Sequence, residues 1–228
     1  MGIGRIKTDG TKAAFSKDVL QIEIRGPKQE HLSIIDLPGL FSVAIKRETT
    51  KRDIALVRDM AKQYMKNKRS IILAVVPANT DISTQEIVQI AEDLDPEGER
   101  TLGIFTKPDI VDQGAEQTIV NVVAGRSHIL KHGWCVVKNP SQRELLDPES
   151  DRHECEKNFF DSKEPWTSLP KDRVGIAALK TRMQRLLGHI IHREFSQVCW
   201  LDLVAVHTAV RSDCIVGAER TYDENQRN

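Results

Sequence analysis

The sequence predicts an α/β fold in which a mixed, mostly parallel β-sheet is flanked by helices. The runs 70–76, 101–105 and 135–137 are apolar and rich in β-branched residues, as expected for strands buried on both faces. These runs alternate with segments whose apolar residues recur at helical spacing. Strands that alternate with helices form βαβ units, and these place helices on both faces of a parallel sheet.

The N-terminal region begins with a polar segment, residues 1–17, and then predicts two further strands. Residues 19–24 alternate between apolar and polar side chains, the pattern of a half-buried strand, and Gly26-Pro27 ends this run. The short apolar run 31–36 predicts a second strand. We expect the two strands to form a hairpin, which adds an antiparallel pair to the sheet.

Helical periodicity and polar caps define the remaining elements. Helices are predicted for residues 50–66, 81–94, 116–123, 151–163 and 174–194. Ser83 or Thr84 is the expected N-cap of the second of these helices. The charged composition of residues 151–163 predicts a solvated helix. Residues 196–228 lack clean periodicity and predict either the start of a further helical element or an irregular tail.

The composition is that of a soluble globular protein without a dominant charge. Lys+Arg 33 balance Asp+Glu 33, so charge predicts neither a nucleic-acid partner nor an anionic membrane. No apolar stretch reaches the roughly 18 residues of a membrane-spanning helix, and no secretory signal follows Met1. The 4 cysteines show no C-x-x-C spacing, which favours reduced thiols in an intracellular protein. His153 and Cys155 alone are too few ligands for a structural metal site.

Asp36-Leu37-Pro38-Gly39 follows the predicted strand 31–36 and is the first candidate site loop. A carboxylate at the end of a strand can hold Mg²⁺ through water beside a polyphosphate. Gly39 would let its backbone N–H approach a phosphate without a Cβ in the way. The same tetrapeptide is also an ordinary turn sequence, so this motif alone does not decide the function.

Thr106-Lys107-Pro108-Asp109 ends the strand 101–105 and is the second candidate loop. The Asp109 carboxylate can accept hydrogen bonds from the N1–H and the exocyclic amine of guanine, a pair of donors that adenine does not offer. The Lys107 stem can lie over the base plane while its ammonium reaches polar groups around the nucleotide. The alternative is a strand-ending turn with a surface aspartate.

Lys138-Asn139-Pro140-Ser141-Gln142 follows the strand 135–137 and is the third candidate loop, placed to close over the other edge of a base. Open α/β sheets bind ligands at the carboxyl ends of their strands. Three such loops in this order predict a guanine-nucleotide site. The sequence contains no G-x-x-x-x-G-K-S/T loop to hold the phosphates.

These motifs resemble those of the dynamin superfamily of large GTPases. The resemblance extends over residues 15–195, and its most specific stretches are residues 32–39, 72–81, 95–101 and 106–109. The A-N-x-D and D-P-x-G-x-R-T stretches are more typical of this family than of small GTPases. T-K-P-D and K-N-x-S are similar to the dynamin- and Mx-like proteins of filamentous fungi.

The resemblance implies a P-loop-type G domain that binds GTP and Mg²⁺. Asp36 would serve Mg²⁺ through water and Gly39 the γ-phosphate. Lys107 and Asp109 would hold the guanine and Asn139 the base or ribose side, and Thr106 would also belong to the nucleotide-binding residues. No catalytic residue is assigned.

The resemblance also implies a cytoplasmic mechanoenzyme that remodels membranes or divides organelles such as mitochondria. Such an enzyme associates peripherally with membranes or with microtubules, and it assembles with itself or with related dynamin-like GTPases. Nucleic acid is not an expected partner.

The chain departs from the family at its N-terminus. Family members carry a first strand, the P-loop and a first helix upstream of the strand that corresponds to residues 19–24. The resemblance therefore predicts a partial G domain at 18–173, a terminal G-domain helix at 174–195 and a partial stalk or irregular tail at 196–228. We expect impaired turnover, because the groups that hold the phosphates are missing. We also expect marginal stability, because two strands would flank a vacancy. The alternative is a non-catalytic remnant or interaction module that docks on intact relatives.

Overall fold

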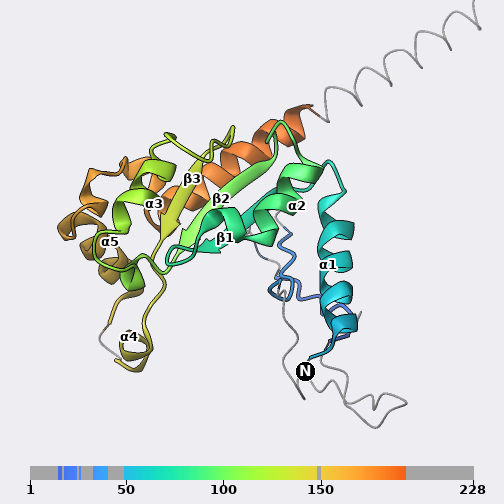
Figure 1. The fold of residues 1–228 in the computed structure, drawn as a ribbon, viewed down its shortest axis with the longest axis horizontal. Coiled ribbons are helices and arrows are strands. Elements are labelled where there is room, and N and C mark those ends of the chain that lie inside the picture. Colours follow the sequence, from blue (N-terminus) through green and yellow to red (C-terminus); the bar gives the residue numbers. More distant parts are fainter. Residues whose placement is uncertain are drawn as a thin grey trace, which may run out of the picture. The chain divides into compact units, whose positions relative to one another are not determined.

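A parallel β-sheet forms the framework of this protein (Figure 1). The computed structural model describes residues 15–16, 18–24, 26, 33–40, 49–147 and 150–193. The sheet is 3-stranded with the order β1-β2-β3, formed by β1 Ile72–Pro77, β2 Thr101–Thr106 and β3 Trp134–Val137. Thr106 is paired in register with Pro77 on one side and with Val137 on the other. The carboxyl ends of all described strands are therefore level with one another.

The helices follow the predicted alternation with the strands. The α-helices are α1 Lys51–Met65, α2 Glu86–Leu94, α3 Glu116–Val123, α4 Gln142–Leu146 and α5 Arg152–Ser162. Short 3₁₀ turns lie at Ile82–Thr84, Pro108–Ile110, Trp166–Ser168 and Lys171–Arg173. Residues 175–193 are helical and cross the boundary between two structural units, Met1–Leu179 and Lys180–Asn228. No helix in the described part of the chain is long and apolar enough to cross a lipid bilayer.

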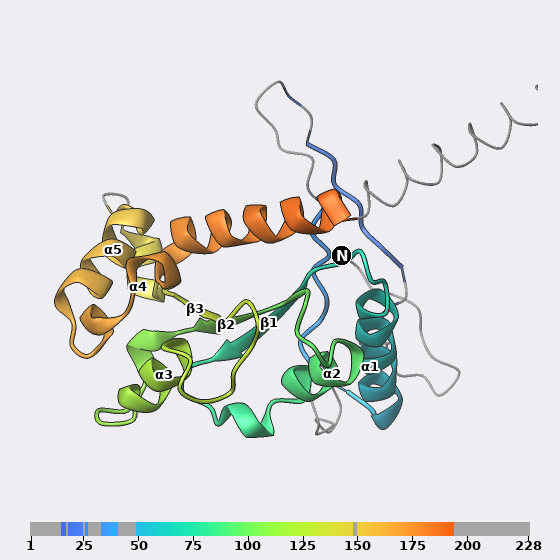
Figure 2. The same ribbon diagram turned by 90° about the horizontal axis from the view of Figure 1, so that it is seen from above.

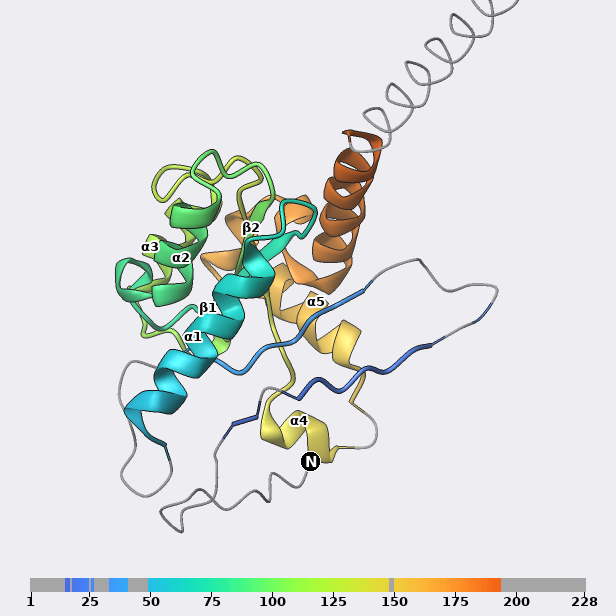
Figure 3. The same ribbon diagram turned by 90° about the vertical axis from the view of Figure 1, so that its right-hand side faces the viewer.

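Helices α1, α2 and α3 pack against the sheet in the first unit (Figure 2). Ala61 and Met65 of α1 form an apolar cluster with Ile72 of β1 and with Ile90 and Ala91 of α2. Helix α1 lies on the β1 side of the sheet, whereas α4 projects away from it (Figure 3). No residue of α4 is buried, in agreement with its position.

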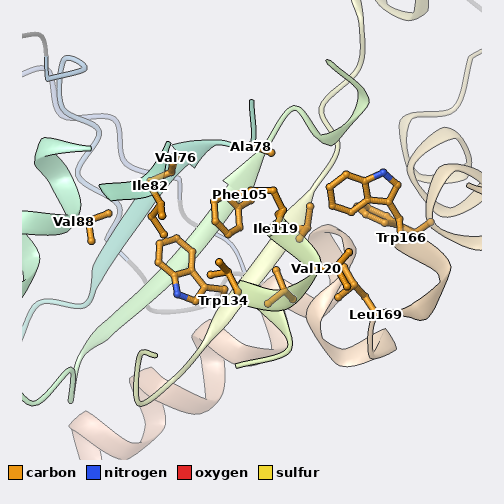
Figure 4. Packing of buried hydrophobic residues seen from close by; sticks show 14 residues of the cluster. Val76, Ala78, Ile82, Val88, Phe105, Ile119, Val120, Trp134, Trp166 and Leu169 are labelled. Atoms are coloured by element: carbon orange, nitrogen blue, oxygen red, sulfur yellow. The ribbon is translucent and has the colours of Figure 1, made fainter. Parts of the chain in front are cut away.

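The larger apolar cluster joins the strands to α2, α3 and α5 (Figure 4). The rings of Phe105 in β2 and Trp134 in β3 stack with centroids 4.7 Å apart. Gly103 makes this possible, because a Cβ at this position would lie 2.2 Å from the Trp134 indole. The Trp134 Nε1–H donates to the carbonyl of His128 at 2.8 Å, so the buried ring keeps a polar partner.

The stretch Asp95 to Thr101 is a polar connection that holds α1 and α2 to β2. Buried Arg100 donates from its guanidinium to the carbonyls of Met65 at 2.7 Å and Leu94 at 3.1 Å, at the ends of α1 and α2. Asp95 accepts the backbone N–H of Arg100 at 3.0 Å and the Thr101 hydroxyl at 2.6 Å. Burial alone would raise the pKa of Asp95, but these hydrogen bonds lower the pKa below its ordinary value.

Three parallel strands and the flanking helices confirm the predicted fold class, but the N-terminal hairpin is not formed in the described residues. Residues 18–24 and 33–40 contain no strand, and Val19, Ile22 and Ile34 are 70%, 76% and 70% exposed. Residues 31 and 32 lie outside the described part. An alternating pattern becomes a strand only when a neighbouring strand takes up its backbone hydrogen bonds, and neither described segment has one.

Several local predictions also needed correction. The predicted helix 81–94 is divided, because Asp81 caps the 3₁₀ turn Ile82–Thr84 and accepts the Ser83 N–H at 2.8 Å. Helix α2 then follows Gln85, which makes no side-chain cap, so neither Ser83 nor Thr84 caps it. Helix α5 is not wholly solvated, since Glu156 and Phe160 are buried. Residues 196–228 lie outside the described part of the chain.

Candidate functional site

The loop after β2 is a tight turn held by backbone hydrogen bonds, one of them from the residue that follows β1. The N–H of Ala78, just after β1, donates to the Thr106 carbonyl at 2.8 Å. Lys107 follows in the left-handed region, with φ 57 and ψ 47, and Pro108 is buried at the start of the 3₁₀ turn. A side chain in this conformation costs about 1–2 kcal/mol, a strain that often occurs in ligand-binding loops.

Lys107 and Asp109 present unused polar groups at this turn. Lys107 is exposed and Asp109 is partly exposed. Within the described residues, neither the Lys107 ammonium nor the Asp109 carboxylate has a hydrogen-bond or ion-pair partner. Both groups are therefore available to a ligand without first breaking a described bond.

The loop after β3 starts from the strand next to β2, at the same edge of the sheet. Lys138 is buried and donates from Nζ to Glu144 Oε1 at 2.8 Å and Oε2 at 2.9 Å. Glu144 also accepts the Ser141 N–H at 2.7 Å, within the capping box that begins α4. The Lys138 ammonium, followed by the Ser141 N–H, lowers the pKa of Glu144 to about 2.

Asn139 lies between these fixed residues and is exposed. Its Oδ1 accepts one long hydrogen bond, 3.4 Å from Arg152 Nη2 at the start of α5. Because Thr106 pairs with Val137, the loops that carry Lys107, Asp109 and Asn139 leave adjacent strands at one sheet edge. The structure thus brings the predicted guanine-side residues to one place.

Glu156 is a residue of this region that the sequence reasoning missed. Its carboxylate is buried in α5, where Oε1 accepts the Lys138 N–H at 2.9 Å and Oε2 accepts the Ile176 N–H at 2.9 Å. The charged composition of the segment suggested a solvated helix. Helical spacing was the available signal, since Glu156 lies four residues before buried Phe160 and shares its face.

The predicted phosphate-side residues lie outside the sheet, in a segment that packs near the first residue of β1. Asp36 and Gly39 are exposed, while Leu37 and Leu40 pack against the cluster that contains Ile72, the first residue of β1. Thr106, in contrast, is level with Pro77, the last residue of β1. In the described structure no hydrogen bond or ion pair connects Asp36 to the other candidate loops, so its role at Mg²⁺ stays a prediction.

In the described residues, the candidate site has no cluster of metal ligands, and the nearby surface hollow is not part of it. The described residues contain no group of three or more His, Cys, Asp or Glu side chains that could hold a metal ion. Mg²⁺ usually takes one or two carboxylates together with phosphate oxygens, so Asp36 would suffice only beside a bound polyphosphate. An open hollow of about 490 Å³ lies beyond the β2 loop, between Val111 and Pro165, and none of the predicted site residues lines it.

In a comparison with known proteins, two family models match successive ranges of this chain. The model of the Dynamin family matches residues 4–108, and that of the Dynamin central region matches residues 118–198. An interferon-induced GTP-binding protein Mx from Perca fluviatilis is 36% identical over 185 residues, which cover 80% of this chain and 60% of that protein. The Mx2 proteins of Macaca mulatta and Homo sapiens are each 41% identical over 139 residues, or 60% of this chain.

The chain spans less than two thirds of the length of these relatives. The match covers 60% of the Perca fluviatilis protein and 19% of either Mx2 protein. The two family models nevertheless follow one another along this chain in the order expected for a dynamin-type protein. The chain belongs to the dynamin superfamily of large GTPases.

Proposed function

We propose that this chain supplies the guanine-recognising side of a GTP site in a dynamin-type G domain. One observation carries the proposal. Lys107 and Asp109, whose side chains have no partners in the described structure, lie at the carboxyl end of β2, beside the loop of Asn139 at the end of β3. Open α/β sheets bind their ligands at this edge. The names of the Mx relatives describe them as GTP-binding proteins.

The Asp109 carboxylate is the group that would select guanine. It is acceptor-only when ionised, so it fits the adjacent N1–H and exocyclic amine of guanine and opposes the bare N1 of adenine. A hydrogen bond to a charged group contributes about 1.5–3 kcal/mol, which corresponds to roughly 10- to 100-fold in affinity. Lys107 would cover the base with its aliphatic stem, and Asn139 would approach the base or ribose from the neighbouring strand.

The phosphate side of the site would involve Asp36 and Gly39, with Mg²⁺ shared between Asp36 and phosphate oxygens. The printed sequence contains no G-x-x-x-x-G-K-S/T loop, and that loop supplies most contacts to the β- and γ-phosphates in P-loop enzymes. We therefore expect weak nucleotide binding and impaired hydrolysis from the chain as printed. An intact dynamin-type protein would assemble in a GTP-dependent manner and hydrolyse GTP to remodel membranes, in the cytoplasm and at membranes or microtubules.

A binding experiment on the full chain tests the guanine assignment. Fluorescent GDP and ADP analogues are titrated against the wild type, against Asp109→Asn and against Asp112→Asn as a matched exposed control. We expect tighter binding of GDP than of ADP, and a roughly 10- to 100-fold loss of GDP affinity in Asp109→Asn alone, because one charged acceptor is removed. Equal binding of both bases by the wild type would contradict the proposal.

The second candidate function is an interaction module that docks on intact relatives without catalysis. The observation in its favour is the exposure of the apolar side chains of Val19, Ile22, Ile24 and Ile34, together with an outer edge of β1 that pairs with no described strand. Edges and apolar patches of this kind are sites for strand addition. Co-elution of the chain with an intact dynamin-family GTPase in size-exclusion chromatography would support it, and separate elution would oppose it.

A further inference from the structure

We infer that Glu156 is a positioning residue that links the guanine-side loop after β3 to the first turn of the helix 175–193. The inference rests on the proposed function for the part that concerns nucleotide, and on the described contacts alone for the link. A single carboxylate accepts the N–H of Lys138 at 2.9 Å and the N–H of Ile176 at 2.9 Å. These donors are far apart in sequence, and helix α5 brings the acceptor between them.

The surroundings of Glu156 favour a fixed arrangement over a chance contact. The side chain is only 5% exposed, so a lost acceptor would leave backbone N–H groups without water to replace it. Val174 forms a parallel bridge with Val136 in β3, which places the approach to the helix alongside that strand. Glu156 thus joins two segments that the strand already holds side by side.

Gly175 completes the arrangement. Its φ is +80, and a Cβ there would lie 3.3 Å from Glu156 Oε2, so glycine suits both the backbone conformation and the closeness of the carboxylate. The helix can therefore begin at the point where its Ile176 N–H reaches Glu156. A side chain at position 175 would push on the same oxygen.

The loop is fixed from its other side as well. Glu144 holds both the Lys138 ammonium and the Ser141 N–H, so Asn139 lies between two anchored residues. With Glu144 fixing the loop to α4, Glu156 is a side-chain contact through which a shift of the first turn of the helix would reach the backbone of Lys138. Binding of guanine and the position of that turn would be coupled, and such coupling is reciprocal.

Hydrogen exchange followed by mass spectrometry on the full chain tests the link without depending on nucleotide. Glu156→Gln keeps the size of the side chain but leaves only one acceptor oxygen, and exposed Glu154→Gln is the matched control on the same helix. We expect exchange at the Lys138 and Ile176 amides to rise on the order of 10-fold in Glu156→Gln and to stay unchanged in Glu154→Gln. If Glu156→Gln unfolds, Gly175→Ala should speed exchange at the Lys138 amide, which lies in a different part of the sequence.

The same measurement with a fluorescent GDP analogue separates the link from the proposed function. Nucleotide should slow exchange at Ile176 in the wild type but not in Glu156→Gln, and the preference for GDP over ADP should narrow in that variant. Unchanged exchange at Lys138 in both Glu156→Gln and Gly175→Ala would overturn the inference. A wild type that binds no GDP analogue, with both amides still released in Glu156→Gln, would refute the proposed function and uphold the link.

Discussion

Replacing Arg100 with alanine should destabilise this protein more than any surface arginine change. The Arg100 guanidinium donates to the carbonyls of Met65 at 2.7 Å, Leu94 at 3.1 Å, Ser70 at 3.0 Å and Asn67 at 3.3 Å. The side chain is 5% exposed, so these carbonyls lose their donor in a place where water enters poorly. The variant would release the ends of α1 and α2 together.

The magnitude follows from the kinds of group involved. A hydrogen bond to a charged donor contributes about 1.5–3 kcal/mol, and a cation at a helix C-terminus adds about 0.3–1 kcal/mol. The cost of burying the guanidinium offsets part of this sum, and contacts that share one group are not additive. We therefore expect the free energy of unfolding to fall by about 3–5 kcal/mol in Arg100→Ala, and by roughly half as much in Arg100→Lys, which lacks the planar fork.

Urea unfolding followed by circular dichroism measures this change on the full chain. Arg126→Ala is the control, because Arg126 is exposed and its guanidinium bonds, at 2.9 Å, only to the Asn121 side chain among the contacts described. A loss of 3–5 kcal/mol would lower Tm by roughly 6–20 °C for a chain of this size. A loss below about 1 kcal/mol, or one equal to that of Arg126→Ala, would refute the assignment of Arg100 as the connection between these helices.

Two further predictions concern the loop after β3 and the ring stack. The pKa of Glu144 is held at about 2 by the Lys138 ammonium, so its stabilising contribution is complete above the ordinary carboxyl pKa and is lost as the pH falls toward 2. Urea midpoints measured from neutral to acidic pH should therefore fall less steeply in Glu144→Gln than in the wild type, and identical slopes would contradict this. Gly103→Ala should lower the free energy of unfolding by about 1–3 kcal/mol and shift tryptophan fluorescence, because a Cβ would lie 2.2 Å from the Trp134 indole. Gly188→Ala, with nothing within 4 Å of the added Cβ, should be neutral or slightly stabilising, and equal effects would contradict the steric argument.

The elements that sequence predicted well are those whose pattern is satisfied locally. Helix α1 begins after Thr50, where the capping box with Asp53 is formed, and its buried face follows the predicted apolar spacing. The strands β1, β2 and β3 were predicted because continuous apolar runs have no other stable place than a covered sheet. The segments 19–24 and 31–36 have equally good patterns, but a strand also needs a partner, and the pattern does not state whether one is present.

The sequence allowed a prediction of which residues face a ligand, but it did not show which residues support their loops. Asp109 was assigned because a carboxylate matches the hydrogen-bond donors of guanine, and Asn139 was assigned from the family resemblance. The left-handed backbone of Lys107 and the contacts of Glu156 were not predicted, since they depend on how distant backbone groups meet in three dimensions. A carboxylate that accepts only backbone N–H groups has no partner residue type that sequence inspection could search for.

The sequence motifs of this family fall into two groups. In one group the polar side chains are bonded to other groups of the protein, and in the other they are not. In the stretch before β2, Arg100 donates to backbone carbonyls, and Asp95 accepts from a backbone N–H and a hydroxyl. That motif therefore holds helices to the sheet. Asp81 likewise caps a turn through Ser83.

The side chains of Lys107 and Asp109 occupy an equally well-defined turn yet bond to no described residue, so the fold gives them no role and a ligand-binding role is our proposal for them. The same criterion assigns the buried Lys138 to support, because Glu144 takes up its ammonium. It leaves exposed Asn139, with its single long bond, as the residue of that loop that we propose for contact with the nucleotide.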